Sequence, residues 1–296
     1  MPKVNVNGVE LWYQFSGEGA TVVQIGGAVS AHEGYATITP GLSQHYRVLD
    51  YDHRGYGSSD RPVQRYTLDT WSDDLAGLMD ALDLERAHIH GGSMGSFIAV
   101  NFAARYPDRV DKLVLGAGAV GRCDRMGVLQ FRVWQSLARA YGVASREVAE
   151  QLLIDAFSRA FLDGPDGGDG AVDLMQEITA RNVGTDVFVD ACQAMIDTDV
   201  TGQLHRVAAP TLVMVGSEDV LTPLDAGPGG AGARYVAENL PDARLVVFEG
   251  SGHGHYVEQQ EESLDAILGF LAEQEELAAL CTHSEDSAAN SPLAGG

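Results

Sequence analysis

Hydrophobic and polar residues alternate at the beginning of the chain. Residues 4–15 follow a period of two that is interrupted by Asn7-Gly8, a dipeptide typical of the tight turn between two antiparallel strands. Short apolar runs rich in β-branched residues then recur along the chain, and such runs are typical of strands buried on both faces of a parallel sheet. The runs lie at residues 21–25, 46–51, 87–90, 112–115, 211–215 and 244–248.

Helical patterns separate several of these strands. Residues 67–84 place apolar side chains at every third or fourth position, with acidic side chains between them. Residues 96–106 form a second predicted helix, made largely of small residues, which ends before Pro107. The alternation of strands and helices predicts an α/β fold around a mostly parallel sheet.

This alternation stops between about residues 120 and 207, where only helical patterns occur, and we interpret the stretch as a helical cap packed over the sheet. Within it, the glycine- and aspartate-rich residues 163–170 are predicted to form a loop. The end of the chain is rich in Ala, Ser, Gly, Asn and Pro, which predicts disorder. The predicted organisation is core at 1–120, cap at 121–206, core at 207–277 and a disordered tail at 278–296.

Composition narrows the class of partner. The chain has 42 acidic and 19 basic residues and a formal charge of −23, which opposes binding to nucleic acid or to anionic membranes. No apolar run approaches the roughly 18 residues of a membrane span, and the N-terminus does not resemble a signal peptide. Cys123, Cys192 and Cys281 are too few and too widely spaced for a disulfide framework. We expect a soluble cytoplasmic protein with a small-molecule substrate; its oligomeric state stays open.

The strongest chemical signal is Gly91-Gly92-Ser93-Met94-Gly95, which fits the pattern G-x-S-x-G. It lies between a predicted strand and a predicted helix, and this context places a serine on a sharp turn above the sheet edge. The backbone N–H of Met94, at the start of the helix, can then donate to a developing oxyanion. Taken alone, the same five residues could also be a glycine-rich helix start with a capping serine.

Together with four further motifs, this segment resembles the α/β-hydrolase superfamily, over about residues 5–271. The other motifs are Gly26-Gly27-Ala28, residues 52–59 (DHRGYGSS), residues 210–219 (PTLVMVGSED) and Gly250-Ser251-Gly252-His253. All five follow one another in the order found in the family. Local similarity is greatest to the capped branch that includes 3-oxoadipate enol-lactonases and meta-cleavage C–C bond hydrolases.

The resemblance implies a catalytic triad of Ser93, Asp219 and His253, in the family's chain order. A serine hydroxyl is a weak nucleophile until a base removes its proton. A histidine can accept that proton, and an aspartate can fix the imidazole tautomer. The oxyanion hole would comprise the N–H groups of Ala28 and Met94, and no metal or organic cofactor is implied. Asp225 and Glu218 remain weaker candidates for the acid.

For this branch, the expected reaction is hydrolysis of a small carboxylic ester or lactone through an acyl-serine intermediate. C–C hydrolysis of a 2-hydroxy-6-oxo-dienoate is the second reading, disfavoured because Gly92 stands where such hydrolases tend to have asparagine. A tailoring enzyme of natural-product assembly and a non-catalytic binding protein on the same fold stay open as alternatives. Serine at position 93 excludes the relatives that use an aspartate nucleophile, haloalkane dehalogenases and epoxide hydrolases.

Gly27, His32 and Trp134 are the candidates for substrate contact. The sequence is at least as compatible with a solvent-exposed His32 and with a Trp134 that packs between helices. Two other signals are interpreted as structural. Asp52 and Arg54 are expected to form a charged pair that holds their loop. Residues 227–232 fit G-x-G-x-x-G, but no strand precedes them directly, so a flexible loop is predicted rather than a cofactor site.

The paired histidines, His88 with His90 and His253 with His255, lack a third ligand at metal-binding spacing, and no metal is expected.

Overall fold

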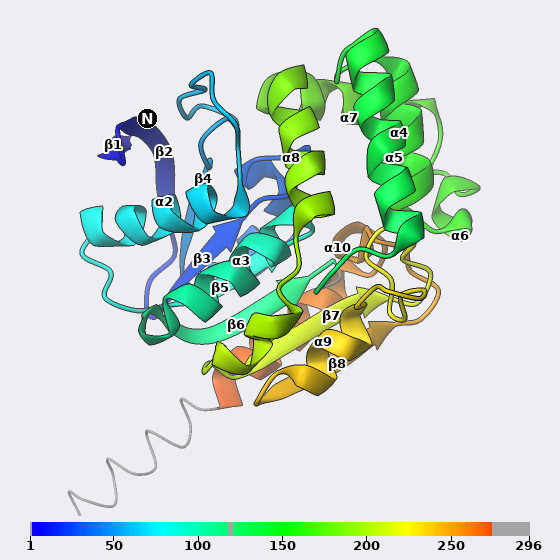
Figure 1. Cartoon of the computed structure of the whole chain (residues 1–296). Helices are drawn as coiled ribbons and strands as arrows, with labels where there is room; N and C mark the ends of the chain where they lie inside the picture. Colours follow the sequence, from blue (N-terminus) through cyan, green and yellow to red (C-terminus); the bar gives the residue numbers. More distant parts are fainter. Residues whose placement is uncertain (1, 118–120, 274–296) are drawn as a thin grey trace, which may run out of the picture.

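The computed structural model describes residues 2–117 and 121–273, and it places eight strands in one sheet in the order β1-β2-β4-β3-β5-β6-β7-β8 (Figure 1). The strands are β1 (Lys3–Val6), β2 (Val9–Ser16), β3 (Thr21–Ile25), β4 (Arg47–Tyr51), β5 (Ala87–Gly92), β6 (Val110–Gly116), β7 (Thr211–Gly216) and β8 (Ala243–Phe248). Strands β3 to β8 run parallel to one another, whereas β2 pairs antiparallel with β1 and β4. The prediction of an α/β fold around a mostly parallel sheet is confirmed.

The first two strands form the predicted hairpin. Val6 pairs with Val9, and the two residues between them adopt positive φ, 50° at Asn7 and 79° at Gly8. Asparagine and glycine tolerate this left-handed backbone better than other residues, which is why the dipeptide marks the turn in the sequence.

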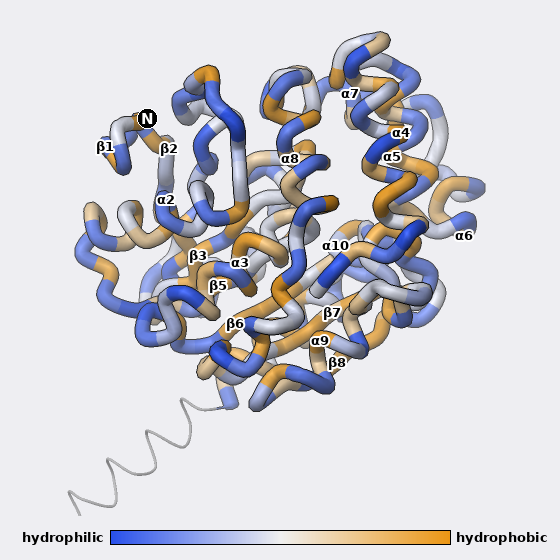
Figure 2. Tube along the Cα trace, viewed as in Figure 1, coloured by the Kyte–Doolittle hydropathy of each residue, from blue (hydrophilic) through white to orange (hydrophobic). Residues whose placement is uncertain are grey.

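Helices cover both faces of the sheet. One apolar layer includes side chains of α2 (Leu68–Ala81) and α3 (Met94–Arg105), and the other includes side chains of α1 (Thr39–Leu42) and of a last helix at residues 260–273. Because successive strand residues point to opposite faces, a continuous apolar run serves both layers. Figure 2 shows the central strands coloured largely hydrophobic and many of the outer segments hydrophilic.

Only helices and connecting segments are described between β6 and β7, where the sequence predicts the cap. They are α4 (Arg125–Tyr141), α5 (Arg146–Ala156), α6 (Arg159–Leu162), α7 (Asp169–Asn182), α8 (Thr185–Asp197) and the 3₁₀ helix η3 (Thr201–Arg206). Helices α4, α5, α7 and α8 stand together above one end of the sheet (Figure 1). The predicted loop at 163–170 is too long by two residues, because α7 already begins at Asp169.

Helix α3 begins at Met94, two residues before the predicted start; Ser93 is its N-cap residue, and the Ser93 side chain makes no capping hydrogen bond. The predicted tail at 278–296 lies outside the described residues. None of the helices in residues 2–117 and 121–273 is long and apolar enough to cross a membrane.

A row of polar side chains crosses four strands on one face of the sheet, and its members on β4, β3 and β5 are buried. The pairing register aligns Gln14 with Asp50, Asp50 with Gln24, and Gln24 with His90. Gln24 Nε2 lies 3.3 Å from His90 Nδ1, and His90 Nε2 lies 2.6 Å from the hydroxyl of Tyr256. Burial raises the pKa of Asp50 to about 6 and lowers the pKa of His90 to about 3, so the interior favours the uncharged form of both groups.

The lowered pKa of His90 predicts a stability that falls in acid. Between its ordinary value of 6.5 and about 3, the unfolded chain binds a proton at this site that the folded chain does not. The free energy of unfolding should therefore decrease as the pH falls, with a contribution from His90 of about 1.4 kcal/mol per pH unit within this window. Urea unfolding of wild type and His90→Gln between pH 6 and pH 4 measures the difference in slope; parallel curves would contradict the prediction.

Candidate active site

Ser93 occupies the turn between β5 and α3. Its backbone has φ 55° and ψ −123°, a strained conformation for a residue with a side chain. The N–H of Ser93 donates to the carbonyl of Gly116 on β6 at 3.1 Å, which anchors the turn to the neighbouring strand. The turn therefore lies at the carboxyl end of parallel strands, where open α/β sheets bind their ligands.

Close backbone approaches explain the glycines around this serine. A Cβ at Gly91 would overlap the carbonyl oxygen of Gly95, and a Cβ at Gly95 would overlap the carbonyl oxygen of Ile25 on β3. Any larger residue at either position would push the strand end away from the helix start. The two glycines of the G-x-S-x-G pattern are thus required by the geometry of the turn.

The structure brings Ser93, His253 and Asp219 together from three loops. His253 Nε2 lies 2.8 Å from Ser93 Oγ, and His253 Nδ1 lies 2.9 Å from Asp219 Oδ2. Asp219 follows β7, and His253 lies between β8 and the short helix α10 (His255–Glu258). The imidazole therefore bridges a hydroxyl and a buried carboxylate, the arrangement in which it can act as a general base.

The other two acids considered from the sequence lie on the surface. Asp225 is exposed and forms an ion pair with Arg234, whose Nε lies 2.8 Å from Asp225 Oδ1. Glu218 is exposed as well. Of these three acids, only Asp219 contacts the imidazole of His253.

Thr222 is a member of this cluster that the sequence analysis did not identify. Its hydroxyl lies 2.7 Å from Asp219 Oδ2, 3.0 Å from His253 Nδ1 and 2.8 Å from the carbonyl oxygen of Ala117. The N–H groups of Leu221 and Thr222 both donate to Asp219 Oδ1 at 2.9 Å. The spacing Asp219-x-x-Thr222, with a carboxylate ahead of free N–H groups, is the signal that could have indicated it.

These contacts keep Asp219 ionised although it is buried. Burial alone would raise the pKa of its carboxyl group, but the charge and hydrogen bond of His253 and the hydrogen bonds from Thr222 outweigh burial and lower the pKa. An ionised Asp219 can hold the Nδ1–H tautomer of His253 and stabilise the imidazolium that forms when Nε2 takes a proton.

The predicted oxyanion-hole residues lie beside the nucleophile. A Cβ placed on Gly27 would be 3.3 Å from the Cβ of Ser93, so the segment after β3 runs directly against the serine. The hydroxyl of Tyr56 donates to the carbonyl of Ala28 at 3.1 Å and fixes that peptide. Met94 opens α3, where the first N–H groups of a helix have no carbonyl partner within the helix.

His255 is distinct from His253 in chemistry as well as in place. It is fully buried, its Nε2 accepts from the N–H of Ala117 at 2.9 Å, and its Nδ1 lies 2.9 Å from Ser263 Oγ. Burial and the charge of His253 lower the pKa of His255 to about 3. It therefore holds two chain segments together as a neutral imidazole.

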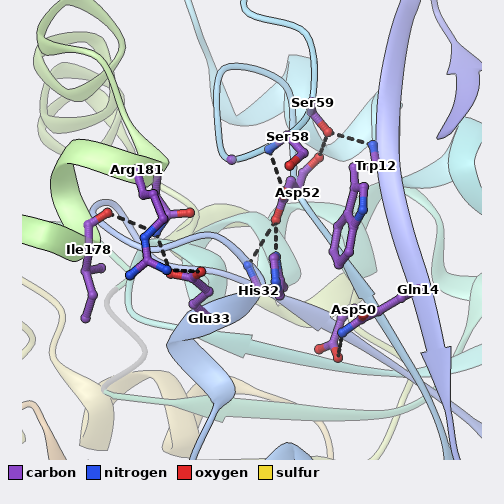
Figure 3. Close-up of polar contacts among 12 residues, drawn as sticks. Trp12, Gln14, His32, Glu33, Asp50, Asp52, Ser58, Ser59, Ile178 and Arg181 are labelled. Atoms are coloured by element: carbon purple, nitrogen blue, oxygen red, sulfur yellow. Dashed lines mark hydrogen bonds and ion pairs between the residues drawn. The ribbon is translucent and has the colours of Figure 1, made fainter. Parts of the chain in front are cut away.

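His32 and Trp134 have structural partners. His32 Nδ1 lies 2.6 Å from Asp52 Oδ1, and its ring packs on Trp12 with centroids 4.2 Å apart (Figure 3). Trp134 Nε1 donates to Asp155 at 2.7 Å inside the group of helices α4 to α8. Contact of either side chain with substrate stays a prediction.

The expected charged pair between Asp52 and Arg54 is wrong. Arg54 instead forms a buried bidentate pair with Asp74 of α2, and Asp52 accepts from His32 and from the N–H of Ser58. Each of the two side chains therefore pairs with a residue of another segment, Arg54 with Asp74 and Asp52 with His32. The loop is held as predicted, but by different partners.

The glycine-rich residues 227–232 pack against the start of the helical segment. The N–H of Gly227 donates to Asp124 Oδ2, and Arg122 Nε donates to the carbonyl of Gly229, both at 2.6 Å. No group of three or more His, Cys, Asp or Glu residues in the described part of the chain is arranged to hold a metal.

Comparisons with known proteins agree with this geometry. A family model described as the alpha/beta hydrolase fold matches residues 21–259. The chain is 33% identical over 282 residues to a 2-hydroxy-6-oxononadienedioate/2-hydroxy-6-oxononatrienedioate hydrolase of Paraburkholderia xenovorans LB400, covering 89% of this chain and 91% of that protein.

Two solved structures extend the comparison. The enol-lactonase from Burkholderia xenovorans LB400 has a TM-score of 0.80 and 26% identity, with 92% of this chain and 100% of that chain covered. The meta-cleavage product hydrolase from Pseudomonas fluorescens IP01 has a TM-score of 0.77 and 28% identity, with coverage of 93% and 98%. The chain belongs to the α/β-hydrolase family, which confirms the resemblance found in its sequence.

The position of Thr222 predicts that its hydroxyl supports the reactivity of Ser93. Thr222→Val keeps the shape of the side chain but removes the hydrogen bond to Asp219; a bond to a charged group contributes about 1.5–3 kcal/mol. The rate constant for labelling of Ser93 by a fluorophosphonate should fall by about ten- to a hundredfold. Thr222→Ser retains the hydroxyl and should react nearly as fast as wild type; equal rates for all three proteins would refute this role.

Proposed function

We propose that this protein is a serine hydrolase that cleaves a small carboxylic ester or lactone through an acyl-serine intermediate. The observation that carries the proposal is the position of His253, within hydrogen-bond distance of Ser93 Oγ on one side and Asp219 on the other. Membership of the α/β-hydrolase family supports the hydrolytic class, and the enol-lactonase is among the similar structures.

In the proposed acylation step, His253 Nε2 takes the proton of Ser93 Oγ as the oxygen attacks the carbonyl carbon. The negative charge on the former carbonyl oxygen is stabilised by the N–H groups of Ala28 and Met94. Collapse of this intermediate breaks the bond to the alkoxide, which receives the proton from His253. For a lactone, this alkoxide stays attached to the acyl group.

Deacylation repeats these steps with water as the nucleophile. His253 takes a proton from water, hydroxide adds to the acyl carbon, and the Ser93 oxygen leaves with the proton returned by His253. The products are a carboxylic acid and an alcohol, or a hydroxy acid from a lactone. Asp219 stays ionised throughout and stabilises the imidazolium in both halves of the reaction.

C–C bond hydrolysis of a 2-hydroxy-6-oxo-dienoate is the second candidate, supported by the Paraburkholderia relative and the Pseudomonas structure. The residue before the nucleophile argues for the ester or lactone. A Cβ at Gly92 would lie 2.9 Å from the hydroxyl of Tyr35, so an asparagine there would require Tyr35 to move.

An activated serine can be tested without knowledge of the substrate. A fluorophosphonate should add once to wild type: Ser93 Oγ bonds to phosphorus, fluoride leaves, and His253 accepts the proton. Intact mass should show one adduct on wild type and on Ser136→Ala, a control that removes an exposed serine of α4. Ser93→Ala and His253→Ala should show none. Absence of an adduct on folded wild type would contradict the proposal.

The choice between the two reactions can be tested with a substrate panel. We expect turnover of p-nitrophenyl acetate and of a small γ-lactone, and Ser93→Ala should reduce kcat/KM by several orders of magnitude. A 2-hydroxy-6-oxo-dienoate is assayed in parallel by loss of its absorbance and by the mass of its products. Turnover of the dienoate without turnover of ester or lactone would establish the second candidate instead.

A further inference from the structure

Two consecutive residues, His32 and Glu33, hold the segment that leaves the oxyanion-hole residue Ala28. They begin the 3₁₀ helix η1 (His32–Tyr35) and point in opposite directions (Figure 3). His32 contacts Asp52, in the loop after β4, through both its ring and its backbone N–H. Glu33 reaches across to the end of helix α7. One side chain therefore ties the segment to the core, and the other ties it to the helices above the core.

The carboxylate of Glu33 receives two contacts from α7. Asn182 Nδ2 donates to Oε2 at 3.0 Å, and Arg181 Nη1 lies 3.2 Å from Oε1. The two contacts differ in environment, because Asn182 is only 2% exposed whereas the side chain of Arg181 is 60% exposed. A bond to a buried amide is screened little by solvent, so Asn182 is the stronger partner.

The same end of α7 also holds the residue that fixes the Ala28 peptide. The carbonyl of Asn182 accepts from the N–H of Gly57 at 2.8 Å, and Val183 forms a backbone bridge with Tyr56. Tyr56 is fully buried and donates its hydroxyl to the carbonyl of Ala28. Residues 181–183 thus contact the oxyanion segment at both of its ends, through Tyr56 and through Glu33.

The segment between these two contacts has little freedom to absorb a shift. A Cβ at Gly26 would lie 2.7 Å from the carbonyl oxygens of Ser30 and Ala31, so the chain folds back closely on itself. The N–H of Gly34 donates to the carbonyl of Ala31 at 3.1 Å, which closes the following turn. The backbone from Gly26 to Gly34 is therefore closely packed on itself.

From this arrangement we infer that Glu33 is a positioning residue for the oxyanion hole, acting by fastening the segment after Ala28 to Asn182 at the end of α7. The inference rests on the proposed serine hydrolase function and adds to it a dependence of the oxyanion hole on the seating of α7. Glu33 itself does not touch the reacting atoms; its effect reaches them through the backbone of residues 28–33.

The inference predicts a defect in the transition state rather than in substrate binding. Glu33→Ala should lower both the fluorophosphonate labelling rate and kcat for p-nitrophenyl acetate by about ten- to a hundredfold, because a misplaced oxyanion donor acts only on the developing charge. KM should change less than about threefold. Glu33→Gln replaces the carboxylate by an amide whose oxygen can still accept from Asn182, and this variant should recover most of the rate.

Two further variants make the comparison specific. Asn182→Ala removes the buried donor and should reproduce the defect of Glu33→Ala. Asp111→Ala removes an exposed carboxylate whose partner is Arg86 at 2.7 Å, between the segment before β5 and the start of β6, and should react like wild type. Thermal unfolding shows whether each variant is folded. The labelling rates and kcat values are compared at a temperature at which all variants are native.

The outcomes separate this inference from the proposed function. If wild type is labelled at Ser93 and Glu33→Ala is labelled equally fast, Glu33 has no positioning role and the hydrolase proposal stands. A loss of rate in Glu33→Ala that Glu33→Gln does not recover, or a rise in KM without a fall in kcat, overturns the inference as well. If wild type itself is not labelled, the proposed function fails first.

Discussion

The left-handed backbone at Ser93 is the constraint on which the rest of the site depends. A residue with a side chain in such a conformation costs about 1–3 kcal/mol, which the surrounding structure must offset. It is tolerated because Gly91 and Gly95 allow the strand end, the helix start and β3 to approach within backbone contact. The same approach places the segment of Gly27 and Ala28 beside the hydroxyl. The positions of Ser93 and of the segment of Gly27 and Ala28 are therefore consequences of one tight turn.

The loops around this turn are connected by buried carboxylates. Asp52, Asp74 and Asp219 are each at most 4% exposed, and each meets a basic side chain from another segment: His32, Arg54 and His253. A buried carboxylate without such a partner would be strongly destabilising, so each pair fixes the relative position of two segments. Most acidic side chains in residues 2–117 and 121–273 are exposed or partly exposed, whereas these three are buried and paired.

The sequence predicts most of the strands to within two residues, because buried parallel strands are continuous apolar runs and their local pattern needs no tertiary information. The residues of the predicted triad, Ser93, Asp219 and His253, lie in short glycine-containing motifs, and the structure brings their side chains within hydrogen-bond distance. Partners from distant segments were not predictable. Arg54 meets Asp74 rather than Asp52, and Glu33 meets Asn182 across 149 positions of the chain. Such pairs depend on how helices and loops pack, which periodicity does not encode.

The glycine-rich loop at 227–232 has a consequence for the modularity of the protein. It follows the loop of Asp219 in the core, yet it binds Arg122 and Asp124 at the entrance to the helical segment, and the chain leaving that segment also pairs there through Asp199. The start of the helical segment, its end and the glycine-rich loop therefore contact one another. A chimera that exchanges only residues 121–206 with a relative would replace one side of these contacts and leave the other unchanged. The unit that can be transplanted comprises the helices together with the loop at 227–232.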